Sequence, residues 1–234
     1  MNIEEAAHHD SGDDFAKMDC GISDRLGFIR KVYGILSTQL LITSCFTLYA
    51  MSSTSMKTTL DNPAYSGIVI ATYIVSICAL VCCKQDKKVP ANYIWLLIFT
   101  LCVSWIVATV CVRTKPTVVV EAAFLTTSVV VAITIYAVTT KNDYTVCGPL
   151  MFILGFVFLT ASILACCFGP QMNLLWSTLG VILFSFYLLI DTQMIVSTGH
   201  KKYQIGEDSY ILAALALYLD IINIFLYIIE MLNN

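Results

Sequence analysis

Three carboxylates occur within long apolar runs of the sequence, where ionisable residues are rare. They are Asp191, Asp220 and Glu121. An aspartate at the centre of a membrane helix costs roughly 2.5–3.5 kcal/mol on insertion scales, so such residues need partners or water. The two aspartates should therefore face the interior of a helix bundle, and we expect the three carboxylates to carry the function.

Asp191 and Asp220 lie in consecutive apolar runs and are expected to form a pair. The polar segment between the runs begins near Ser197 and ends near Tyr210, which puts the aspartates about 9 and 15 Å from one boundary. Two carboxylates at one low-dielectric site cannot both ionise easily, so they should share a proton and act as a pH-responsive gate. Doubly ionised, they would also attract calcium as a metal ligand pair. The alternative is that each aspartate is only a hydrogen-bonded anchor between helices.

Small and polar residues share the helical face of each aspartate. The residues at helical spacing from the two aspartates are Ala213, Ala216, Asn223 and Tyr227 for Asp220, and Ser177, Gly180, Phe184 and Tyr187 for Asp191. Small residues permit close approach of helices, and tyrosine or asparagine can donate hydrogen bonds to a carboxylate. We therefore expect Tyr187 and Asn223 to make supporting polar contacts.

The elements that must position these residues are membrane helices. Of the 234 residues, 58% are hydrophobic and 12% are charged, against roughly 25% charged in an ordinary soluble domain. Continuous rather than alternating apolar runs favour helices over barrel strands. The sequence predicts an all-α integral membrane protein, a bundle of seven transmembrane helices whose last member either crosses fully or is re-entrant. The expected spans are about 32–52, 65–83, 91–112, 117–138, 146–168, 173–196 and 210–231.

The polar segments predict the orientation of the bundle. Residues 1–24 are polar, acidic and without hydrophobic period, so we expect a disordered cytosolic tail before a membrane domain at 25–234. With the N-terminus in the cytosol, ten Lys and Arg residues fall on the cytosolic side and three on the other. The sequence has no basic patch for nucleic acid, and the partners expected from composition are membrane lipids.

Glu121 has two equally good interpretations. It lies near Arg113 and Lys115 at the non-cytosolic end of its span, where it either attracts cations to a pore mouth or pairs with these neighbours.

Signatures of other activities are missing from the sequence. The three histidines lack a second ligand at metal-site spacing, and there is no phosphate-binding loop or nucleophile elbow. An intramembrane aspartyl protease would need Tyr-Asp, Gly-x-Gly-Asp and Pro-Ala-Leu motifs, and a retinal protein would need a lysine in residues 210–231. We therefore expect no enzyme activity and no cofactor.

Five strings of the sequence are distinctive: Arg25–Leu36, Leu125–Thr127, Thr140–Thr145, Ile190–Met194 and Leu217–Phe225. They resemble the Bax inhibitor motif-containing transmembrane family, and most of all its lifeguard branch, which includes the Golgi anti-apoptotic proteins. The resemblance extends over residues 25 to 231, and the last two strings, on consecutive spans, are the most specific.

The resemblance implies a seven-helix calcium leak channel of the Golgi or endoplasmic reticulum that lowers stored calcium and restrains programmed cell death. In similar proteins the aspartates matching Asp191 and Asp220 form a pH-sensing pair at the cytosolic side of the pore. In viral Golgi relatives an acidic residue just before the last helix affects conductance, and Asp208 has that place here, with Glu207 beside it. Bacterial relatives latch the pair with an arginine in the second helix, but residues 65–83 contain none.

A second function fits the same sequence. A non-conducting membrane regulator would act by binding death-pathway or calcium-release proteins, as a monomer or a homo-oligomer. Packing faces and pore faces look alike in a sequence, so both functions stay open at this point.

Overall fold

A computed structural model describes residues 3–83, 88–168, 173–197 and 202–233, with the backbone alone for residues 3–22, 164–168, 173 and 207. The described residues form helices and turns without any strand. Among them, seven helices are long and apolar enough to cross a membrane, which confirms the predicted all-α bundle.

The helices follow the predicted spans closely. Their bounds are α1 (Ile3–Ser52), α2 (Thr54–Leu60), α3 (Pro63–Val81), α4 (Ala91–Arg113), α5 (Pro116–Thr139), α6 (Gly148–Phe168), α7 (Asn173–Val196) and α8 (Tyr210–Asn233), with short 3-10 turns η2 (Thr145–Cys147) and η3 (Glu207–Ser209). Prolines occupy the first positions of α3 and α5. Proline lacks a backbone N–H, but the N–H groups of the first turn have no partner within the helix, so proline is well suited to begin one.

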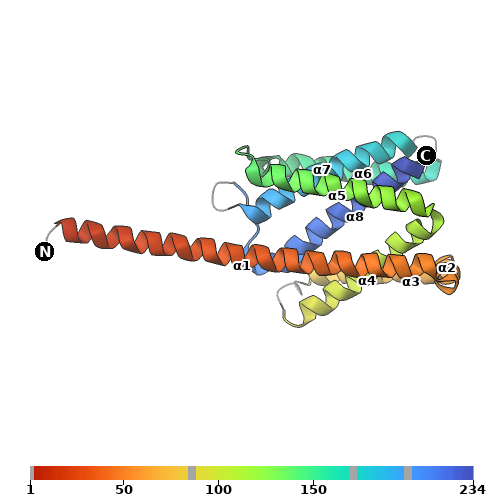
Figure 1. The fold of residues 1–234 in the computed structure, drawn as a ribbon, viewed down its shortest axis with the longest axis horizontal. Coiled ribbons are helices and arrows are strands. Elements are labelled where there is room, and N and C mark those ends of the chain that lie inside the picture. Colours follow the sequence, from red (N-terminus) through yellow and green to blue (C-terminus); the bar gives the residue numbers. More distant parts are fainter. Residues whose placement is uncertain (1–2, 84–87, 169–172, 198–201, 234) are drawn as a thin grey trace.

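One helical segment differs from the prediction. The helix α1 runs unbroken from Ile3 to Ser52, and its candidate membrane span within the described residues, Ser23–Ser52, includes the predicted span of about 32–52. The short helix α2 was not expected, and its first turn is capped by the Ser53 side chain, which accepts a hydrogen bond from the Met56 backbone N–H. The helix α1 also extends N-terminally beyond the bundle (Figure 1), and the disorder expected for residues 1–24 stays a prediction.

Helix α8 occupies the middle of the bundle. It packs against α1, α4, α5 and α7, and it crosses the molecule diagonally between α1 and α5 (Figure 1). Its 24 residues form one unbroken helix of about 36 Å, which is long enough for a hydrocarbon core of about 30 Å. The last span is therefore a full-length helix in this structure, and the re-entrant alternative is not needed.

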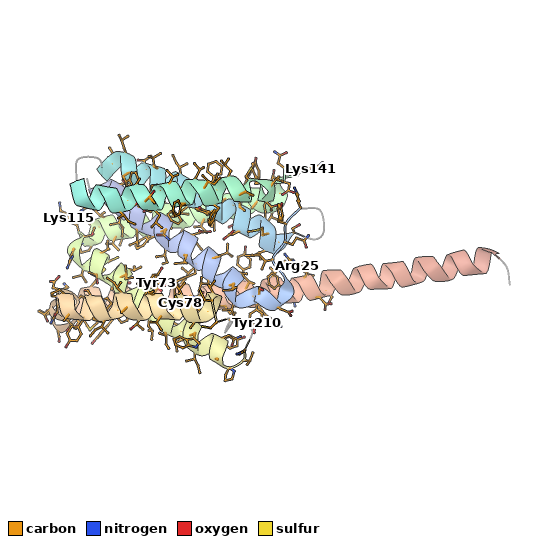
Figure 2. The ribbon with its side chains drawn as sticks, turned by 180° about the vertical axis from the view of Figure 1, so that it is seen from behind. Arg25, Tyr73, Cys78, Lys115, Lys141 and Tyr210 are labelled. Atoms are coloured by element: carbon orange, nitrogen blue, oxygen red, sulfur yellow. The ribbon has the colours of Figure 1, made fainter. Side chains whose placement is uncertain are left out.

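The bundle has two ends that we name by their residues. Arg25, Lys141 and Tyr210 lie at one end, here called the Arg25 end, and Lys115 lies at the opposite end, here called the Lys115 end (Figure 2). The prediction that the Arg25 end faces the cytosol follows from the excess of Lys and Arg in its segments and stays a prediction.

Candidate functional site: a buried acidic pair beneath a polar clasp

The two aspartates lie on the helices that pack together most extensively, α7 and α8. The Asp220 side chain is only 6% exposed, whereas Asp191 is partly buried. The two carboxylates interact electrostatically with each other. The structure thus brings the two predicted residues into one interior site.

One oxygen of this pair has no compensating contact. Asp220 Oδ2 is buried and has no hydrogen-bond partner among the described residues. A buried carboxylate without partners is costly, because its hydration is lost without compensation. Protonation of this carboxyl or a bound cation would compensate for that cost.

The residues expected to support the pair make other hydrogen bonds. The Tyr187 hydroxyl donates to the backbone carbonyl of Met151 on α6 at 2.7 Å, although Tyr187 interacts electrostatically with both aspartates. The Asn223 side-chain amide donates to the Leu219 carbonyl of its own helix at 2.8 Å. Both groups were expected to donate to the carboxylates, and both instead satisfy nearby backbone carbonyls, which are strong acceptors.

Close packing of α7 on α8 depends on a glycine. A Cβ added to Gly180 would lie 2.6–2.7 Å from ring carbons of Tyr227. The Tyr227 ring is itself held between Phe184, at a centroid distance of 5.8 Å, and Phe158, also at 5.8 Å. The missing side chain of Gly180 therefore allows the close approach that brings the two acid-bearing helices together.

A polar clasp covers the Arg25 end of the site. We use this name for Arg25, Asp143 and Gln193. The Arg25 guanidinium, which is 6% exposed, donates to the carbonyl of Met194 in the last turn of α7 and, at 2.7 Å, to that of Ile205. Arg25 thus ties α1 to the end of α7 and to the segment leading into α8.

The other two members hold the segment between α5 and α6. The Gln193 amide donates to the Asn142 carbonyl at 3.0 Å, and its oxygen accepts from the Tyr144 N–H at 2.9 Å. Asp143 accepts from the Thr145 hydroxyl at 2.6 Å and from the Lys202 N–H at 2.9 Å. Three chain segments therefore meet within one hydrogen-bonded unit above Asp191.

This clasp was not predicted from the sequence. Arg25 counts among the ten basic residues of the predicted cytosolic side and belongs, like Gln193, to a family string, and a basic latch was expected in the second span alone. A signal was present, because an arginine in the first turns of an apolar helix must find backbone or carboxylate acceptors when it is buried.

The predicted permeation residues lie apart from the pair. Asp208 lines a polar cavity of about 580 Å³ at the Arg25 end, together with Asp24 and Lys31. The side chain of Glu207 lies outside the described residues. Glu121 is exposed on α5, and the expected basic neighbour Arg113 pairs with Asp61 at 3.1 Å instead. Their roles in permeation stay predictions.

A bound metal would have few protein ligands here. The residues that the structure describes contain no group of three or more His, Cys, Asp or Glu side chains able to hold a metal. Asp191 and Asp220 offer four carboxylate oxygens, whereas calcium takes about 6–8 oxygen ligands. Water or backbone oxygens would have to complete the coordination shell.

The fold and the site define a polytopic helical membrane protein with an acidic pair buried at its centre. Residues 25–234 match the family model described as inhibitor of apoptosis-promoting Bax1, and the chain belongs to this family. It is 32% identical over 217 residues to human Protein lifeguard 3, covering 88% of this chain and 68% of that protein.

Plant proteins are similar at the same level. The Arabidopsis thaliana Protein LIFEGUARD 4 is 35% identical over 211 residues, covering 86% of this chain and 82% of the relative. A BI1-like protein of the same plant is 33% identical over 216 residues, covering 90% and 81%. The family resemblance inferred from the short strings is thus confirmed.

Proposed function

We propose that this protein is a pH-sensitive calcium leak channel of endomembranes, with Asp191 and Asp220 as its gating pair. The observation that carries the proposal is the buried, unpartnered oxygen of Asp220 on the central helix, in electrostatic contact with Asp191. Such a pair shares one proton readily and repels itself once both groups are charged.

Gating follows from the position of the pair between two packed helices. Loss of the shared proton adds a negative charge between α7 and α8, which weakens their contact and attracts a cation. The packing of α8 against α1, α4 and α5 lets a small movement of this helix affect the whole bundle. Tyr187 of α7 also interacts electrostatically with both aspartates.

Further carboxylates extend the proposed ion path. Asp208, with Glu207 beside it in the sequence, would collect cations at the Arg25 end, and Glu121 would do so at the Lys115 end. The polar cavity that Asp208 lines supports the first assignment.

We propose from family membership that the protein restrains programmed cell death. The matching family model is described as an inhibitor of apoptosis-promoting Bax1, and the relatives carry the name lifeguard. A steady calcium leak from the Golgi or the endoplasmic reticulum would lower the stored calcium available to death signals. This location is proposed together with the function.

Reconstitution of the purified chain into liposomes that contain a calcium-sensitive dye tests the proposal. Calcium leak should occur, and its rate should differ between pH 5 and pH 8, because the proposed gating pair shares one proton. Asp191→Asn and Asp220→Asn should each abolish the pH dependence. The double variant should resemble either single variant, since the two residues act as a unit.

Asp61→Asn is the matched control. Asp61 is also an aspartate near a helix end, but it is exposed and paired with Arg113. This variant should keep the leak and its pH dependence. Absence of leak from the folded wild-type chain would refute the channel and favour the non-conducting regulator that binds death-pathway or calcium-release proteins.

A further inference from the structure

A groove between α1 and α4 opens near the Arg25 end of the bundle. It encloses about 360 Å³, within the range of about 300–1,000 Å³ that small-molecule sites occupy. Its walls are mostly apolar and include Ile35 and Ile42 of α1 and Leu96 and Leu97 of α4. Gln39 and Thr100, joined by a hydrogen bond of 3.0 Å, lie at its deeper part.

The mouth of this groove is positively charged. Arg30 and Lys31 line it and are exposed, and the lining contains no aspartate or glutamate among the described residues. Lys31 Nζ lies 5.6 Å from the centroid of the Tyr210 ring, which holds the ammonium group near the end of the bundle. Two carboxylates, those of Asp24 and Asp208, line a separate polar cavity, which Lys31 also borders.

The groove has the length of one membrane leaflet. From Lys31 to Ile42, α1 rises about 17 Å, and half of a hydrocarbon core is about 15 Å. The charged residues therefore lie at the level of the headgroups, and the apolar walls continue toward the bilayer centre.

A glycine keeps the groove open. A Cβ built on Gly34, which lines the groove, meets no atom within 4 Å. A Cβ at this position would enter the space of the groove without striking the protein. The position thus offers a way to fill the groove selectively.

We propose that this groove binds an anionic glycerophospholipid, with the headgroup phosphate on Arg30 and Lys31 and one acyl chain along α1 and α4. Basic pockets between membrane helices are suited to anionic headgroups, and an apolar groove at this depth is surrounded by acyl chains. The site is separate from the acidic pair, and the proposal does not depend on channel activity.

Binding of fluorescent phosphatidylserine to the full chain in nanodiscs of phosphatidylcholine tests the proposal. Gly34→Leu should abolish saturable binding because the leucine side chain occupies the acyl-chain path. Gly67→Leu is the matched control, since Gly67 on α3 also has no atom within 4 Å of a built Cβ but lies outside the groove. The control should bind as the wild type does.

The charges provide a second, independent variant. Each basic residue near an anionic surface contributes about a fivefold change in affinity, so the double variant Arg30→Gln, Lys31→Gln should bind about 25-fold more weakly. The double variant Lys57→Gln, Lys115→Gln at the Lys115 end should be unchanged. Excess inorganic phosphate should not displace the lipid, because it lacks the acyl chain.

Equal binding by the wild type and folded Gly34→Leu, or no preference for phosphatidylserine over fluorescent phosphatidylcholine, would overturn the proposal. If Gly34→Leu does not fold, the two double charge variants decide the question. Equal affinities of these two variants for phosphatidylserine would also overturn the proposal.

Discussion

Replacement of Arg25 by methionine should destabilise the bundle far more than an ordinary surface substitution. Arg25 is 6% exposed and donates to two carbonyls, those of Met194 and Ile205, and its guanidinium carbon lies 4.7 Å from the centroid of the Phe28 ring. Hydrogen bonds to charged groups contribute roughly 1.5–3 kcal/mol each, and a cation–π contact adds about 0.5–1 kcal/mol. Part of this gain is offset in the wild type by the cost of burying the charge.

The net loss should therefore be about 2–4 kcal/mol. For a chain of this size about 1 kcal/mol shifts the melting temperature by roughly 2–4 °C, so Arg25→Met should lower it by about 4–16 °C. Thermal unfolding of the purified protein in detergent measures this shift. Hydrogen exchange at residues 202–206 should rise at the same time, because this segment loses its tie to α1.

Arg113→Met is the matched control for this substitution. Arg113 is 63% exposed and its ion pair with Asp61 is also at the surface, so its loss should cost at most about 1 kcal/mol. The loss of stability in Arg25→Lys should lie between those of Arg25→Met and Arg113→Met, because an ammonium group keeps the charge but lacks the planar set of donors of a guanidinium group. Equal shifts for Arg25→Met and Arg113→Met would show that the clasp does not stabilise the bundle.

Two other predictions concern packing and the clasp. Gly180→Ala should lower the free energy of unfolding by about 1–3 kcal/mol, because the added Cβ would meet the confined Tyr227 ring at 2.6 Å. The control Gly67→Ala should be neutral or stabilising. Melting temperatures of the two variants check this prediction, and equal shifts would contradict it. Gln193→Leu should cost about 1–3 kcal/mol and raise hydrogen exchange at Tyr144, since the buried amide holds both Asn142 and Tyr144. Gln204→Leu, at an exposed position, should change stability by no more than about 0.5 kcal/mol, and an unchanged exchange rate at Tyr144 in Gln193→Leu would refute the assigned role.

The sequence alone determined the class of protein, the number of spans and the pair of aspartates. Hydropathy is a local property, and the cost of inserting an ionisable residue depends on its place in an apolar run, so both are readable without a structure. The antiparallel order of the last two spans then places Asp191 and Asp220 at similar depths.

Only the tertiary structure decided which partners the polar groups choose. Tyr187 and Asn223 have the right face for the acidic pair, but backbone carbonyls nearby accept their hydrogen bonds. The contacts of Arg25 and Gln193 join residues between 49 and 180 positions apart, and no local pattern encodes such distances. The central place of α8 has the same origin, because all membrane helices are apolar and only the fit of their side chains determines which one is surrounded by the others.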